Sequence, residues 1–186
     1  MKTYTIERHN SHVNTLNVDD DEYIARRFAI ECAERALPIF ESDVLFDLRP
    51  RDAIEAARHF IEKNKDYLDS VSLLDVSASA LINISADAWA AAWMWAHSGA
   101  KRYAAESAAF AAAIHLPANI AARSAAALAI AAISEKARSA AMAEGAEAAL
   151  EAARRAREAE EAWQVARLQQ LRWEGIRSDV HGISIQ

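Results

Sequence analysis

The amino-acid sequence predicts an all-α protein, an irregular bundle or array of about six alanine-rich helices with short extended or irregular ends. The 186 residues include 45 alanines, the best helix former, against four glycines and three prolines, the two worst. Apolar residues recur three and four positions apart over most of the chain, and opposite charges recur four apart in its last third. We expect a polar arm at residues 1–18, a single helical domain at 19–174 and an irregular tail at 175–186.

The first predicted helix begins after the acidic run Asp19–Asp21. Carboxylates at a helix start accept hydrogen bonds from free N–H groups and suit the positive end of the helix dipole. On the opposite side from its apolar stripe, Arg27, Glu31 and Arg35 lie four residues apart, so the glutamate can pair with either arginine. The apolar stripe itself predicts the buried face: Ala25, Phe28, Ala29, Cys32, Ala33 and Ala36.

Pro38 is expected to end this helix near Ala36, because proline lacks an N–H group and clashes with the preceding turn. A loop at 39–48 then leads to a second helix with Pro50 in its first turn, where the missing N–H group costs nothing. The stripe expected to be buried in this helix is Ala53, Ile54, Ala57, Phe60 and Ile61.

Four further helices are expected, at about 71–97, 101–115, 117–142 and 147–173. The first of them is apolar nearly all round at its end, which indicates a central, buried helix: Trp89, Trp93, Met94 and Trp95. These tryptophans could line a ligand pocket, but core packing is the favoured interpretation. Gly99 is expected to stop that helix, and Gly145 to mark a turn or bend. The last helix is the most charged, with the pairs Glu151–Arg155, Arg154–Glu158 and Arg157–Glu161.

Composition and charge argue against several classes of protein. The net charge of -6 argues against nucleic acid as the main partner, because contacts with phosphates need a basic surface. Cys32 alone cannot form an internal disulfide, which suits a reducing cytoplasm. The start, MKTYTIERHN, lacks the apolar segment of a signal peptide, and the richest apolar runs, 88–96 and 125–133, fall short of the ~20 residues of a membrane span. We therefore expect a soluble, cytoplasmic protein with no membrane contact.

The strongest candidate site is a set of charged residues around the start of the second helix. Its members are Glu41, Asp47, Arg49, Arg51 and Glu55. One interpretation is a local ion-pair network that fixes the angle between the first two helices, with Asp47 capping the second helix. The other is a charged surface for a partner protein. The two interpretations are compatible.

A metal site is the chemical alternative. Glu31 and Glu34 have the Glu-x-x-Glu spacing with which all-helical nucleotide hydrolases hold magnesium, because side chains three residues apart face the same way. The sequence contains no Gly-x-Ser-x-Gly elbow, no glycine-rich phosphate loop and no His-x-x-x-His pair. We therefore expect no cofactor and no catalytic residue. The same glutamate spacing recurs at Glu144 and Glu147 and at Glu158 and Glu161.

Two segments resemble a group of alanine-rich, all-helical bacterial immunity proteins of toxin–immunity (toxin–antitoxin) systems. The first comprises Cys32-Ala33-Glu34-Arg35, Leu37-Pro38, Glu41, Asp47, Arg49-Pro50-Arg51 and Ala53-Ile54-Glu55-Ala56. The second, near the C-terminus, comprises Trp163-Gln164, Arg167-Leu168 and Leu171. Between them the likeness is compositional only, and the link SDVLFDL before Arg49 is longer and less acidic than is usual in the group.

The resemblance implies a cytoplasmic protein that neutralises a bacterial toxin by stoichiometric protein–protein binding, without turnover. The acidic charge would suit a basic toxin, because complementary fields speed encounter. Two alternatives stay open: a magnesium-dependent nucleotide hydrolase that uses Glu31 and Glu34, and a non-enzymatic helical adaptor or regulatory protein. The sequence leaves the identity of the toxin, the binding face and the oligomeric state open.

Overall fold

The computed structural model describes residues 21–42, 44, 46–65 and 76–182, and it confirms the predicted all-α class. The predicted arm at 1–18 and positions 183–186 of the tail lie outside the described residues. No strand occurs in the described part of the chain. Its helices are α2 (Glu22–Glu41), α3 (Arg49–Lys63), α4 (Val76–Met94), α5 (Gly99–Ala111), α6 (Ala118–Ala140), the 3₁₀ helix η2 (Met142–Glu144) and α7 (Ala146–Gly182).

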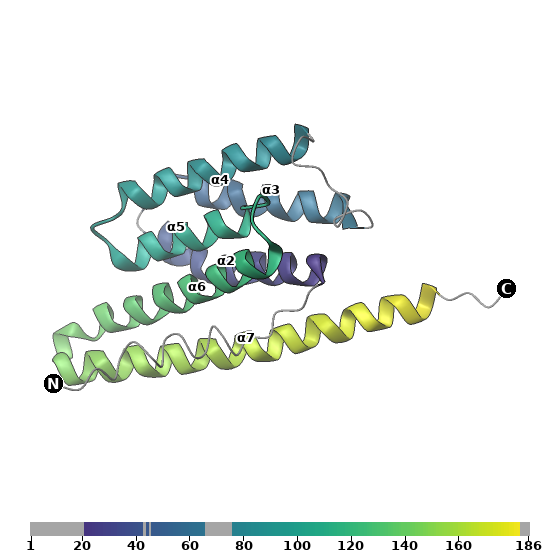
Figure 1. Ribbon diagram of the computed structural model, residues 1–186. Coiled ribbons are helices and arrows are strands. Elements are labelled where there is room, and N and C mark those ends of the chain that lie inside the picture. Colours follow the sequence, from purple (N-terminus) through teal and green to yellow (C-terminus); the bar gives the residue numbers. More distant parts are fainter. Residues whose placement is uncertain (1–20, 43, 45, 66–75, 183–186) are drawn as a thin grey trace.

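The helices pack as a bundle-like array with α2, α5 and α6 at its centre (Figure 1). α2 contacts α3, α5, α6 and α7, so it touches both sides of the array. α3 and α4 cover one side, and α7 lies along the other side against α6 and α2. Within the described ranges, no helix is both long enough and apolar enough to cross a membrane.

Alanine forms most of the core, and this brings the helices close together. The Ser107 hydroxyl of α5 donates to the Ala125 carbonyl of α6 at 2.8 Å, and the Ser85 hydroxyl of α4 donates to the Ala109 carbonyl of α5 at 2.9 Å. A side chain as short as serine reaches a neighbouring backbone only where two helix axes approach closely. The small residues therefore fix the spacing of the central helices.

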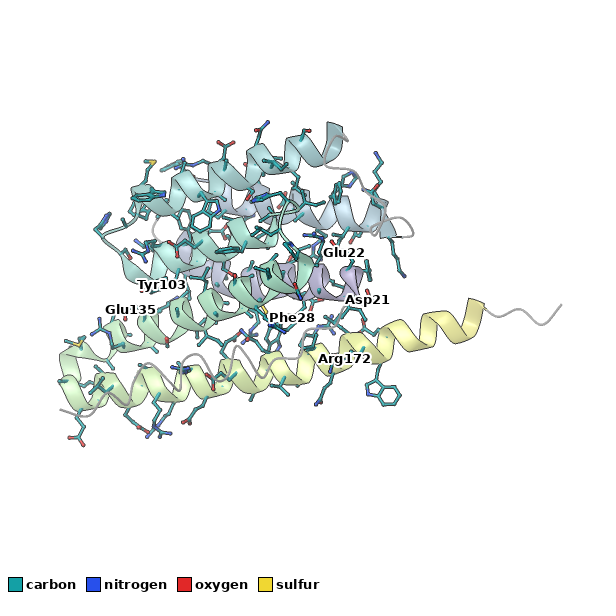
Figure 2. All side chains as sticks on the ribbon, in the orientation of Figure 1. Asp21, Glu22, Phe28, Tyr103, Glu135 and Arg172 are labelled. Atoms are coloured by element: carbon teal, nitrogen blue, oxygen red, sulfur yellow. The ribbon has the colours of Figure 1, made fainter. Side chains whose placement is uncertain are left out.

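α2 begins as the acidic run predicts. Asp21 is its N-cap residue, and its carboxylate accepts a hydrogen bond from the Ile24 N–H group at 3.0 Å. Figure 2 shows Asp21 and Glu22 together at this end of the helix. All six positions of the predicted apolar stripe are buried, with Phe28 fully enclosed.

The prediction that Pro38 ends the first helix is wrong, because α2 continues to Glu41. A proline at position 38 leaves the Glu34 carbonyl without its usual donor from the helix backbone. Pro38 itself is exposed, whereas Ile39 and Phe40 after it are buried in the core. Burial of these two apolar side chains holds the last turn in helical form.

α3 matches the prediction closely. Pro50 lies in its first turn and is buried, and every position of the predicted stripe is buried as well. Position 48 is the N-cap, and its side chain makes no capping hydrogen bond.

The interpretation of the third predicted helix as central and buried is wrong at its C-terminal end. α4 ends at Met94, and Trp93 and Met94 are 78% and 65% exposed. Trp89 does pack in the core, edge-on to the Phe110 ring at 5.2 Å between centroids. α4 lies on one side of the array, and its main contacts within the described residues are with α3 and α5. It therefore leaves part of its apolar surface uncovered.

Gly99 and Gly145 have different roles. Gly99 begins α5 and does not stop the preceding helix, which corrects the prediction. Gly145 makes the predicted turn. Its φ is 114°, a backbone conformation that glycine adopts readily because glycine has no Cβ. The predicted irregular tail is also wrong over residues 175–182, since α7 runs as far as Gly182. A single glycine at position 175 costs a helix only about 1 kcal/mol, too little to end it.

Candidate protein-binding surface

Two segments singled out in the sequence analysis, 32–56 and 163–171, meet in space along one contact, although more than a hundred residues separate them in the chain. We call this contact the α2–α7 seam; it comprises Glu31, Cys32 and Arg35 of α2 and Glu160, Trp163, Gln164 and Arg167 of α7. The Arg167 guanidinium donates to the Glu31 carboxylate at 2.7 Å. The charge of Glu31 holds the pKa of Arg167 above its ordinary value, chiefly through that hydrogen bond.

Arg35 makes the second link across the seam. Its guanidinium donates to the Glu160 carboxylate at 2.8 Å, and lies over the Trp163 ring, 4.2 Å from the centroid. Glu160 is almost fully buried, so its negative charge needs a partner, and Arg35 supplies the positive charge. The expected pairing of Arg35 with Glu31 is replaced by this contact between helices, whereas Arg27 pairs with Glu31 as predicted.

Gln164 and Cys32 complete the seam. The Gln164 amide donates to the Ala126 carbonyl of α6 at 3.0 Å, which ties α7 to a second helix. Cys32 has no exposed surface, and burial raises the pKa of its thiol, with the charges of Glu160 and Glu31 adding to the effect. Most of the resemblance in α2 and α7 thus lies at a structural contact.

The carboxylates of the metal alternative are engaged by arginines. Glu31 accepts hydrogen bonds from Arg27 and Arg167, and Glu34 forms an ion pair with Arg58 of α3. In the described ranges, no three His, Cys, Asp or Glu side chains gather closely enough to hold a metal ion. A magnesium ion would have to displace these arginines.

The remaining signature residues lie at the corner where α2 ends and α3 begins. Asp47 and Arg49 form a bidentate pair, with oxygen–nitrogen distances of 2.8 and 2.7 Å. Glu41 and Arg51 form another, at 2.7 and 2.8 Å, across the helix ends. Four of the five predicted site residues therefore form two pairs: Glu41–Arg51 joins the end of α2 to the first turn of α3, and Asp47–Arg49 joins the loop to that same turn. Glu55 is exposed and has no ion-pair partner among the described residues.

Asp47 holds the corner loop more than it caps the helix. The backbone N–H group of Arg49 donates to this carboxylate over a long distance, 3.4 Å, so the capping bond is weak. The main partner of Asp47 is therefore the arginine side chain. That hydrogen bond lowers the pKa of Asp47, with the charge of Arg49 adding to it and burial opposing it. Arg49 also donates to the Met94 sulfur at 3.0 Å, which joins the loop to the end of α4.

The variant Asp47→Asn is expected to remove part of the pH dependence of folding. A carboxyl whose folded pKa lies below its unfolded value of about 3.9 stabilises the folded state above that pH, and the gain is lost as pH falls through the folded pKa. The difference in unfolding free energy between wild type and variant should therefore be largest near neutral pH and shrink below about pH 4. Urea unfolding at stepped pH measures it, with Asp52→Asn as the control because Asp52 has no ion pair in the described part of the chain. A difference that stays constant from neutral to acid pH would contradict the assignment.

Next to these pairs lies an open hollow of about 710 Å³ with mostly apolar walls. Phe46, Leu48 and Met94 all line it, and they are 97%, 51% and 65% exposed. We call these three side chains the corner patch. The hollow is lined by Val44, Phe46, Asp47, Leu48, Arg49, Asp52, Met94 and Trp95.

The sequence interpretation did not identify the corner patch. The apolar residues of the link SDVLFDL carry no helical or alternating period, so nothing in their spacing predicts which of them face solvent. The proximity of Met94 depends on how α4 packs on α3, which the sequence does not show. The one available signal was the pair Phe46 and Leu48 in a short loop between two helices.

Comparison with models of known protein families, with characterised proteins and with solved structures gives no match.

Proposed function

We propose that this chain is an immunity protein, which neutralises a bacterial toxin in the cytoplasm by binding it stoichiometrically and without turnover. The observation that carries the proposal is the corner patch. Phe46, Leu48 and Met94 are large apolar side chains left in solvent beside a hollow, and clustered exposed apolar side chains are typical of protein-binding sites. The resemblance of the surrounding residues to immunity proteins supports the same role.

The charged residues around the patch support binding rather than catalysis. Asp47 and Arg49 neutralise each other, as do Glu41 and Arg51, and a catalytic acid or base needs a group that is available to the substrate. These pairs hold the loop that presents Phe46.

A helical adaptor is the second candidate, and one observation favours it. Leu150 and Trp173 of α7 are 67% and 65% exposed, at a distance in the chain from the Arg49-Pro50-Arg51 corner. These two side chains lie 23 positions apart on α7 and so mark two separate points on that helix. An adaptor would use at least one such further contact to join two partners, whereas an immunity protein needs one binding face.

Co-expression with each toxin encoded beside the gene tests the proposal. We expect one toxin to lose its effect on growth and to purify with this protein at a ratio of one to one. Toxin that stays inactive at a large excess over this protein would indicate turnover and favour the hydrolase. If no neighbouring toxin is bound or neutralised, the immunity role is wrong.

A further inference from the structure

Among the described residues of the corner, the charged groups without an ion pair include three carboxylates. Asp52 lines the hollow, and Asp87 of α4 is close enough to act on the charge of Arg49. Glu55 acts in the same way on Arg51. All three carboxylates are exposed, and none forms an ion pair with another described residue.

The cations of the corner are engaged. Arg49 is held by Asp47 and Met94, and Arg51 is held by Glu41. Lys101 lies over the Trp95 ring, with its ammonium nitrogen 5.0 Å from the centroid. An approaching molecule therefore meets carboxylates that are free to pair and cations that already have contacts.

The walls of the hollow indicate the size and kind of occupant. A buried small-molecule site covers most of its ligand, whereas this hollow is open and its most exposed wall, Phe46, projects into solvent. Such a side chain is covered only by a surface that extends beyond the hollow. A protein segment does this by placing one apolar side chain in the hollow and packing its neighbours on Phe46 and Leu48.

Several described side chains of the corner already contact one another. Arg49 connects Asp47 to Met94 at the end of α4, and the Phe40 and Trp95 rings pack edge to face at 6.3 Å. Side chains that already have contacts lose less conformational entropy on binding.

We propose that the corner patch binds a basic protein segment, which inserts an apolar side chain into the hollow while its lysines or arginines pair with Asp52, Asp87 and Glu55. The proposal rests on the proposed function, because it names the binding face and the partner chemistry of that same role. The arrangement matches the anatomy of protein interfaces, in which apolar anchors at the centre carry affinity and a charged rim carries specificity. An acidic segment would meet like charges at the rim.

The test is an NMR titration of the full chain with three synthetic peptides of equal length. The first carries a leucine–phenylalanine pair flanked by lysines, the second has glutamates in place of the lysines, and the third keeps the lysines but has serines in place of the apolar pair. The first peptide should shift the backbone amide signals of residues 46–49, 51–52 and 87–97 saturably. The other two should bind at least about tenfold more weakly, because each lacks one of the two required features.

Two matched double variants distinguish the effect of the rim carboxylates on affinity from the effect of the overall net charge. Asp52→Asn with Asp87→Asn should weaken the first peptide by about twofold to thirtyfold, the range for two exposed ion pairs. Glu144→Gln with Glu147→Gln removes the same net charge far along the chain, from exposed residues without ion pairs among those described, and should leave the affinity unchanged. The proposal is overturned if neither lysine peptide binds at the corner, if the glutamate peptide binds equally well, or if the two double variants behave alike.

Toxin co-expression then distinguishes this proposal from the proposed function. If no neighbouring toxin is neutralised but the peptides behave as expected, the immunity role fails and the basic-segment surface stands. If a toxin is neutralised equally by wild type, by Phe46→Ser and by the Asp52→Asn, Asp87→Asn variant, the immunity role stands and this surface is wrong. Phe46 is 97% exposed, so its replacement is compatible with folding.

Discussion

The variant Arg35→Met is expected to lower the free energy of unfolding by about 3 kcal/mol, because it leaves the buried carboxylate of Glu160 without its cation. The Arg35 guanidinium donates to Glu160 at 2.8 Å, and Glu160 is 1% exposed. The Arg35 side chain is 41% exposed and Gln164 still donates to the same carboxylate at 3.3 Å, which places the loss at the lower end of the usual range for breaking a buried pair. Urea unfolding followed by circular dichroism measures the change.

The double variant Arg35→Met, Glu160→Gln is the control for this prediction. It removes the buried charge together with its partner and should recover most of the loss, to within about 1 kcal/mol of wild type. Equal losses in the single and double variants would contradict the assignment. They would show that stacking of Arg35 on Trp163, and not the charge of Glu160, carries the stability.

The variant Ala125→Leu is expected to destabilise the fold by about 1–3 kcal/mol, although leucine is a good helix former. Ala125 has no exposed surface, and its carbonyl receives the Ser107 hydroxyl across the contact between α5 and α6. A larger side chain must push these helices apart and break that hydrogen bond. Thermal and urea unfolding measure the effect.

Ala162→Leu on α7 is the matched control, because Ala162 is exposed and lies on a helix as well. It should change the stability by no more than about 0.5 kcal/mol. If both leucine variants are as stable as wild type, the central helices are less closely packed than the structure indicates.

Helical periodicity alone predicts the buried faces of α2 and α3. The stripe positions recur at three- and four-residue intervals on one side of each helix, and in α2 and α3 that side is buried. Ion pairs within one helix follow from spacing for the same reason, and Arg157–Glu161 and Arg154–Glu158 form as predicted. Local geometry is sufficient for both results.

Contacts between helices are not predictable in this way. The spacing of Glu31 and Arg35 allows a pair within α2, yet both side chains find partners on α7 that lie more than a hundred residues away. The exposure of Trp93 has the same origin, since an apolar helix end is buried only where another helix covers it. The sequence predicted the charged residues of the candidate site but not its apolar residues. Met94 lies beside the loop only because α4 packs on α3, and that packing cannot be predicted from spacing.

Cys32 gives the protein a chemical reporter of its own motion. It is the only cysteine of the chain and is sealed in the α2–α7 seam, where burial raises its thiol pKa. Alkylating reagents attack the exposed thiolate, so the closed state is inert to them. The rate at which the native protein is labelled therefore measures how often the packing around α2 opens far enough to expose Cys32, without any engineered cysteine.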